Sequence, residues 1–206
     1  MGNALGYRKI TARQETEPYR VPGPVCSPLD CFLPLTQRLF EVRDARPQGV
    51  IIGFTSVARG EGVSHVVTSL ARKLAEHTFE QILVTTSAEL ATAAFAKFDD
   101  SAHVQRLSKP NSFAMTARAM RWEDLHSLRQ RFGFVLVDCP ALRVSPSVFT
   151  LANLCDGAVL VVAAGEASRS DIETAQKFLK SSSVKVMGTV LNKQTDPIPE
   201  FLSKVL

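Results

Sequence analysis

The stretch GVIIGFTSVARGEGVSHVVTSLARKLAE occupies residues 49–76. It begins with an apolar, β-rich run at 50–54 and continues through a turn rich in small residues at 55–62. It ends in a segment whose apolar residues recur at helical spacing. Strand, glycine-rich loop and helix, in that order, are the layout of a phosphate-binding loop. In such a loop, backbone N–H groups and a helix N-terminus face an anion.

The loop departs from the general motif G-x-x-x-x-G-K-[ST] at two positions. Gly62 and Ser64 hold their places, whereas Val57 stands at the first glycine and Val63 at the lysine. Gly60 adds the backbone freedom that lets a loop approach a phosphate. The alternative interpretation is a tight strand-to-helix turn whose glycines serve geometry alone, and spacing does not decide between the two.

Two further apolar runs end in residues of functional interest. The run FVLVD at 134–138 ends in an acid, as a Walker B strand does, and such a carboxylate orients the ligands of Mg²⁺. The run GTVLN at 188–192 ends in Asn192, whose amide is expected to contact a nucleobase. Each has a structural alternative, because any buried strand can end in Asp and Asn is common in turns.

Apolar strand-like runs alternate with amphipathic helical patterns, which indicates a parallel sheet covered on both faces. We predict an α/β fold with a mostly parallel sheet, in one P-loop NTPase-like domain at 29–206. A Pro-rich disordered arm is expected at 1–28. Strands are expected at 50–54, 81–85, 104–107, 134–138, 157–163 and 184–191. Helices are expected after the loop and at 29–42, 88–98, 115–131, 145–154 and 170–179, the last with Ser170 and Asp171 as N-cap residues.

Composition argues against several functional classes. The net charge of +4 comes from scattered residues, without the dense basic patch and interleaved aromatics of a nucleic-acid-binding protein. The longest apolar run, at 158–164, is far shorter than the roughly 20 residues that span a bilayer. The cysteines form no metal-binding spacing, so free thiols in a reducing cytoplasm are expected.

Taken together, these motifs resemble the bacterial tyrosine kinase family of capsule and exopolysaccharide synthesis, which is related to the septum-site and partitioning ATPases. The resemblance spans about residues 29–194 and rests on the loop, VDCP at 137–140, CDGAVLVV at 155–162 and GTVLN at 188–192. It implies ATP or ADP with Mg²⁺ as the ligand, Ser64 and Asp138 on the metal, and Asp138 as the catalytic residue if the protein is active. The nucleotide-binding positions that it implies are Arg59, Gly60, Glu61, Gly62, Val63, Ser64, His65 and Asn192.

Four elements of that family are missing from their expected places. These are the phosphate-binding lysine, the acidic Walker A′ motif after the second strand, the Glu-x-x-Arg-x-x-Arg self-association motif and the C-terminal tyrosine cluster. Weak or absent nucleotide binding is therefore expected. The first three places hold Val63, the run Thr85-Thr86-Ser87 with no carboxylate until Glu89, and the set Asp30, Leu33 and Thr36, while the only tyrosines are Tyr7 and Tyr19.

The sequence leaves open whether another cation replaces the missing lysine. Arg59, inside the loop, is the first candidate, with Lys73 and Lys193 behind it, and an ordinary exposed loop residue is the alternative for Arg59. The loss of one charge-assisted phosphate contact costs about 1.5–3 kcal/mol, or roughly 10- to 150-fold in affinity. The transition state of phosphoryl transfer loses more stabilisation free energy than the bound nucleotide does, because charge stabilisation supplies most of that catalysis.

Three functional hypotheses follow. The first is a non-catalytic or weakly nucleotide-binding regulator of exopolysaccharide synthesis or export. The second is an active Mg-ATP-dependent ATPase or tyrosine kinase, and the third is an interaction module that binds no nucleotide. The expected partner is a polysaccharide co-polymerase-type membrane protein or a kinase of the same family, which would hold this cytoplasmic chain at the inner face of the membrane. A homo-oligomer is the other assembly that the resemblance allows.

Overall fold

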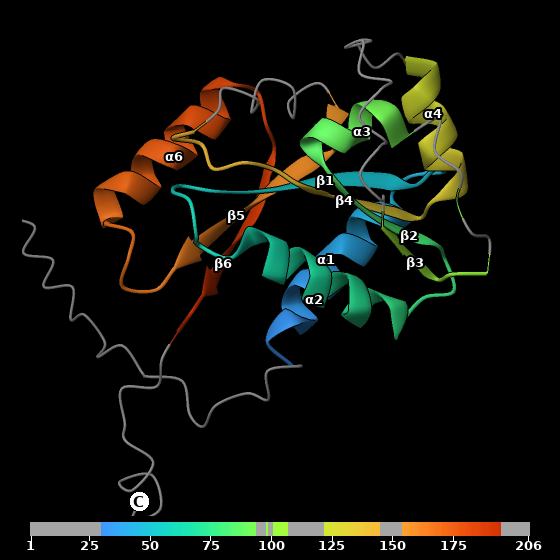
Figure 1. Cartoon of the computed structure of the whole chain (residues 1–206), viewed down its shortest axis with the longest axis horizontal. Coiled ribbons are helices and arrows are strands. Elements are labelled where there is room, and N and C mark those ends of the chain that lie inside the picture. Colours follow the sequence, from blue (N-terminus) through green and yellow to red (C-terminus); the bar gives the residue numbers. More distant parts are fainter. Residues whose placement is uncertain (1–29, 94–97, 99–100, 107–121, 145–153, 195–206) are drawn as a thin grey trace, which may run out of the picture.

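A six-stranded, all-parallel sheet forms the centre of the protein (Figure 1). The computed structural model describes residues 30–93, 98, 101–106, 122–144 and 154–194. The strand order is β3-β2-β4-β1-β5-β6, which confirms the predicted parallel sheet. The strands are β1 (Val50–Ser56), β2 (Ile82–Thr86), β3 (Val104–Arg106), β4 (Phe134–Asp138), β5 (Gly157–Ala163) and β6 (Val186–Asn192).

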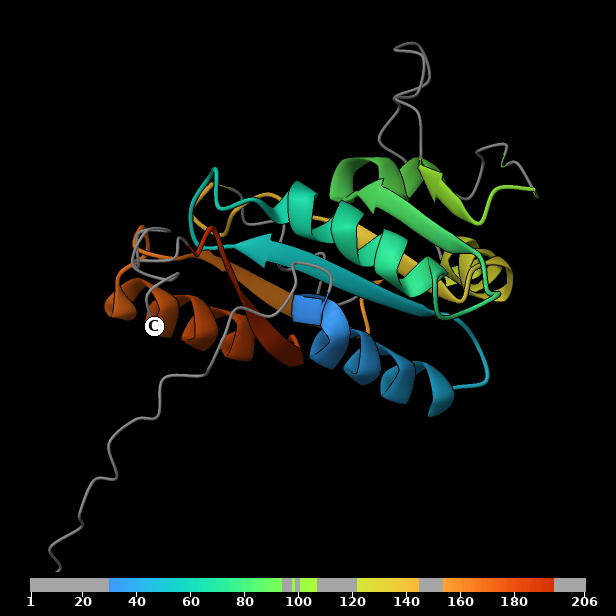
Figure 2. The same ribbon diagram turned by 90° about the horizontal axis from the view of Figure 1, so that it is seen from below.

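Helices cover both faces of this sheet, as the alternating pattern predicted (Figures 1 and 2). α1 and α2 lie on one face, and α3, α4 and α6 lie on the other. The predicted arm at 1–28 and the predicted helical segments at 115–121 and 145–153 lie outside the described residues. The helices are α1 (Leu33–Asp44), preceded by the short 3-10 helix η1 (Asp30–Phe32), α2 (Val63–Ala75), α3 (Ser87–Ala93), α4 (Trp122–Arg131) and α6 (Arg169–Ser181).

The central strands supply two separate apolar cores, because successive side chains of a strand point to opposite faces. Ile51 packs in the core under α4 and α6, whereas Val50 and Ile52 pack in the core under α1 and α2. All seven residues of β1 are buried. Since β1 lies between β4 and β5, the loop that follows it begins from a strand in the interior of the sheet.

Two helix starts are worth describing in detail. α1 begins at Leu33 and holds Pro34 in its first turn, where a residue without an N–H is tolerated. The N-cap of α6 is Ser168 and not the predicted Ser170. The Ser168 hydroxyl accepts the Asp171 N–H at 3.2 Å, and the Asp171 carboxylate accepts the Ser168 N–H at 3.4 Å. Ser168 and Asp171 thus form a reciprocal capping box, and the N-cap lies two positions before the predicted Ser170.

Asp156 joins three elements at the edge of the sheet opposite the loop. Its Oδ2 accepts Ile51 N–H at 2.8 Å and Arg129 Nη1 at 2.5 Å, and its Oδ1 accepts Arg129 Nη2 at 3.0 Å and also contacts Arg46. The Asp156 side chain is only 6% exposed and that of Arg129 16%. A cavity of about 400 Å³ lies at this edge. Arg46, Arg129 and Asp156 line it together with Cys155. The single carboxylate of Asp156 therefore binds both arginines and offsets one of their two positive charges.

Candidate functional site

The loop at 57–62 lies at the C-terminal edge of the sheet, beside the end of β4. The segment after β4 holds its base: Cys139 N–H donates to Phe54 O at 2.9 Å, and Leu142 N–H donates to Ser56 O at 2.8 Å. β1 lies inside the sheet, with β4, β2 and β3 on one side and β5 and β6 on the other, so the strand order changes direction beside it. In open α/β sheets, ligands bind outside the carboxyl ends of the strands at such a point.

The first turn of α2 opens toward this loop. Its N-cap is Gly62, which has no side chain to cap the helix, and no side-chain cap bond is present. The first N–H groups of a helix have no partner within the helix, so those of Val63, Ser64 and His65 are left for an external acceptor. Ser64 and His65 are exposed. Among the described residues, this helix end therefore has the donor arrangement of an anion site.

Glu61 supports the loop from the inside. Its side chain is buried, and its Oε2 accepts Val57 N–H at 2.7 Å and Ala58 N–H at 3.0 Å, while Oε1 is buried without a partner among the described residues. The carboxylate thus points away from the position of an external ligand. At this predicted nucleotide position, only the backbone of Glu61 is suitably placed to contact an anion.

Asn192, at the end of β6, holds the loop in place. Its Nδ2 donates to Glu61 O at 2.8 Å. One N–H of this amide is therefore committed to the loop backbone, and a contact between Asn192 and a nucleobase stays a prediction for its second N–H or its amide oxygen. The contact needs glycine at 62, because a Cβ there would lie 2.2 Å from Asn192 Nδ2.

Gly62→Ala is expected to lower the free energy of unfolding by about 2–3 kcal/mol. A φ of 89° costs a non-glycine residue about 1–2 kcal/mol, and displacing Asn192 removes a hydrogen bond worth about 1 kcal/mol. Urea denaturation measures the change. Gly60→Ala is the matched control, since Gly60 has a φ of 86° but open space around the position of its Cβ. Equal losses for the two variants would contradict a role for the Asn192 contact.

Ser64 and Asp138 meet at the mouth of the loop. Ser64 Oγ donates to Asp138 Oδ2 at 2.5 Å, which joins the start of α2 to the end of β4. Burial raises the pKa of Asp138, although the Ser64 hydrogen bond opposes the shift. A hydroxyl and a carboxylate are oxygen ligands of the kind that Mg²⁺ takes together with phosphates, so the pair fits such an ion. The described residues contain no cluster of three or more His, Cys, Asp or Glu side chains that would hold a metal alone.

Comparisons with known proteins agree with this geometry. The chain is 27% identical to the tyrosine-protein kinase CpsD of Streptococcus agalactiae over 179 residues, which cover 73% of this chain and 77% of the relative. The BceF tyrosine kinase domain superposes with a TM-score of 0.61 at 20% identity, over 76% of this chain and 73% of that one. The VpsO kinase domain gives 0.60 at 18% identity, over 81% and 94%. These two structures support the fold alone. No model of a known protein family matches the sequence.

The chain is similar in sequence to bacterial tyrosine kinases.

Relative to the motif expected for bacterial tyrosine kinases, the largest change is at Val63. Its side chain is buried and packs in the core with Val66 and Val67 of α2. The position that offers a phosphate its lysine in a P-loop is here part of the apolar core. The sequence prediction that Val63 contacts a nucleotide is thus limited to its backbone N–H.

The end of β2, where the bacterial tyrosine kinase pattern predicts an acidic motif, carries hydroxyl groups. Thr86 N–H donates to Glu89 Oε2 at 3.2 Å, and Glu89 N–H donates to Thr86 Oγ1 at 3.2 Å. These reciprocal bonds cap the start of α3. One oxygen of Glu89, the first carboxylate after β2, thus caps α3, and the charge of Glu89 contributes to the raised pKa of Asp138.

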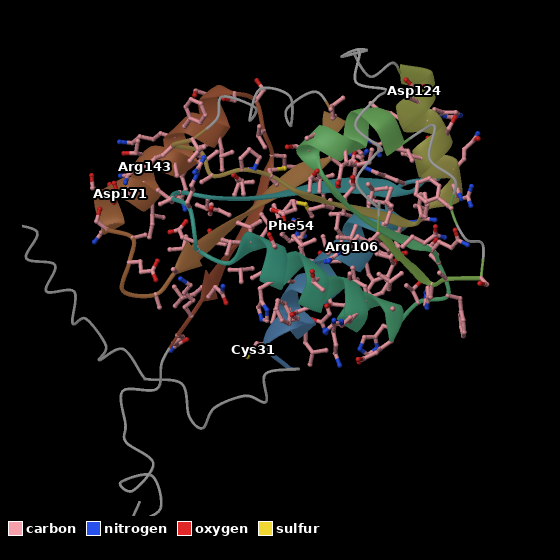
Figure 3. The ribbon with its side chains drawn as sticks, viewed as in Figure 1. Cys31, Phe54, Arg106, Asp124, Arg143 and Asp171 are labelled. Atoms are coloured by element: carbon pink, nitrogen blue, oxygen red, sulfur yellow. The ribbon has the colours of Figure 1, made fainter. Side chains whose placement is uncertain are left out.

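The cations around the loop differ from those that the sequence singled out. Lys73 pairs with Glu76, and Lys193 pairs with Glu166. Arg59 is exposed in the loop. Sequence reasoning missed Arg106 at the end of β3 (Figure 3). Its contact with Thr68 of α2 depends on the order of the strands in the sheet, which no local pattern reveals.

Proposed function

We propose that this protein is a relative of the bacterial tyrosine kinases that binds nucleotide weakly and has lost efficient phosphotransfer. The observation that carries the proposal is the state of the loop. Its backbone and the open first turn of α2 keep the shape of an anion site, whereas the lysine position is a buried valine. Such a site favours a phosphate through backbone dipoles but adds no cationic side chain from position 63.

The absence of the lysine is expected to reduce catalysis more than nucleotide binding. Phosphoryl transfer depends on positive charge aimed at the transferring group, and the missing contact costs about 1.5–3 kcal/mol even in binding. At the end of β2, Thr85 and Thr86 carry hydroxyls in place of the expected acidic motif, and one oxygen of Glu89 is held by the Thr86 N–H. Ser64 and Asp138 would hold Mg²⁺, and Gly60, Gly62 and His65 would contribute backbone donors around the phosphates.

The proposed biological role is regulation of exopolysaccharide or capsule synthesis or export. It follows from the relationship to the bacterial tyrosine kinases and not from the site itself. The proposed partner is a polysaccharide co-polymerase-type membrane protein or an active kinase of the same family, which would recruit the chain to the inner face of the membrane. Within the part of the chain that is described, no helix has the length and apolar character to cross a bilayer.

Titration with Mg-ATP and Mg-ADP tests the nucleotide site. We expect both to raise the thermal unfolding midpoint, since a ligand at about 100 times its dissociation constant adds roughly 2.7 kcal/mol of stability. A parallel assay for phosphate transfer to tyrosine or water is expected to stay at background. Absence of any shift at millimolar nucleotide would overturn the proposal and leave the pure interaction module.

An active ATPase or kinase is the second candidate, and the intact Ser64–Asp138 contact is the observation that favours it. Phosphate release that depends on Mg²⁺ and falls on Asp138→Asn would establish this alternative. Glu41→Gln serves as the control, because Glu41 is an exposed carboxylate that pairs with Arg38 on α1. Activity that is equal in wild type and Asp138→Asn would indicate a contaminating enzyme.

A further inference from the structure

Arg106 carries a charge that the described residues leave without an acidic partner. It is the last residue of β3 and is exposed, and its Nη2 donates to Thr68 Oγ1 of α2 at 2.5 Å (Figure 3). A threonine hydroxyl is neutral, so the contact orients the guanidinium without cancelling its charge. The residue stands apart from the loop in sequence, and no motif marks it.

The register of the sheet explains why Arg106 faces α2. Arg106 pairs with Val84 of β2, and residues paired in register point to the same face. Val84 packs in the core under α2. The Arg106 side chain therefore emerges on the α2 face of the sheet at its outer strand, where it reaches the helix that begins at the loop.

A chain of polar contacts joins this guanidinium to the mouth of the loop. Thr68 Oγ1 donates to Ser64 O at 2.8 Å, and Ser64 Oγ donates to Asp138 Oδ2 at 2.5 Å. Thr68 follows Ser64 by one helical turn, about 6 Å along the axis. The positive charge of Arg106 also opposes the rise that burial produces in the pKa of Asp138. The charge thus lies near the first-turn N–H groups of α2.

We propose that Arg106 supplies the phosphate-binding charge that position 63 lacks. In the bound state the guanidinium turns from Thr68 toward the terminal phosphate of a nucleoside di- or triphosphate at the loop. A guanidinium fork binds phosphate oxygens in pairs, which suits this role better than a single ammonium would. This inference rests on the proposed function and adds to it the source of the cation.

Calorimetric titration of the full chain with Mg-ATP and Mg-ADP tests the proposal. Arg106→Gln is expected to weaken Mg-ATP binding about 10- to 150-fold, the value of one charge-assisted contact, and Arg106→Lys is expected to lose less. Arg72→Gln is the matched control, because it removes the same charge from an exposed position on α2. Since Arg106 is exposed, the free variants are expected to keep the wild-type unfolding midpoint, which separates ligand binding from a structural role.

A double variant gives the sharpest readout. If Arg106 replaces the missing lysine, Val63→Lys combined with Arg106→Gln is expected to bind Mg-ATP at least as tightly as wild type. Wild-type affinity in Arg106→Gln alone would overturn this inference and leave the proposed function standing. Weakening by Arg59→Gln instead would assign the charge to the loop arginine. A wild-type protein that binds neither nucleotide would overturn both proposals.

Discussion

Asp156→Ala is expected to lower the free energy of unfolding by about 3–5 kcal/mol, the cost of leaving a buried charge without its partner. The substitution strands the guanidinium of Arg129, which is only 16% exposed, and removes the acceptor of Ile51 N–H. It therefore removes the side-chain link from the start of β5 to β1 and α4, while the Asp156 N–H still donates to Ile51 O at 2.7 Å. Chemical denaturation monitored by circular dichroism measures the loss.

Two variants separate the buried ion pair from a general charge effect. Glu173→Ala removes an exposed carboxylate that pairs with Arg169 on α6, and its expected effect is within about 0.5 kcal/mol. Asp156→Ala combined with Arg129→Met removes both charges and is expected to recover much of the loss, since an apolar pair of similar volume often replaces a buried ion pair without cost. A loss below about 1 kcal/mol in Asp156→Ala alone would contradict the buried-pair account.

Val63→Lys is expected to strengthen Mg-ATP binding by about 10- to 150-fold while destabilising the free protein. The gain is that of a new charge-assisted phosphate contact. The loss arises because Val63 is buried in the α2 core, and a fully buried valine contributes about 1.5–3 kcal/mol. The stem of the lysine retains part of that burial as its ammonium extends toward the loop. Calorimetry and thermal unfolding measure the two effects separately.

Val63→Met is the matched control for this substitution. It introduces a long unbranched side chain at the same buried position without adding charge, so its stability is expected to change without a gain in nucleotide affinity. Equal affinities of Val63→Lys and Val63→Met for Mg-ATP would show that position 63 does not face the phosphates. That result would remove the loop geometry as a basis for the proposed function.

Much of the fold follows from local sequence. The runs at 134–138 and 157–163 are continuously apolar, as strands buried on both faces must be, and the structure contains both as predicted. The sequence prediction places the N-cap of α6 at Ser170 or Asp171, whereas the structure has Ser168 as the N-cap and begins the helix at Arg169. The Ser168-x-x-Asp171 spacing, a capping-box signal with Asp in place of the usual Glu or Gln, was present in the sequence.

The site was less accessible to sequence reasoning, because its contacts join distant strands. The motif placed Ser64 and Asp138 together, and the structure brings them to 2.5 Å. The motif also proposed Glu61 and Asn192 as nucleotide contacts, yet each side chain holds the loop backbone. Arg106 carried no local signal at all, since its position near α2 follows from the order β3-β2-β4.

The central position of β1 has a consequence for how the chain folds during synthesis. Val50 pairs with Phe134, and Ile52 pairs with Gly157, each more than 80 positions later in the chain. At roughly 5–20 residues per second, a ribosome exposes this mostly apolar strand for several seconds before either neighbour emerges. The nascent chain therefore presents an unpaired, aggregation-prone segment, which is the kind of substrate that chaperones bind.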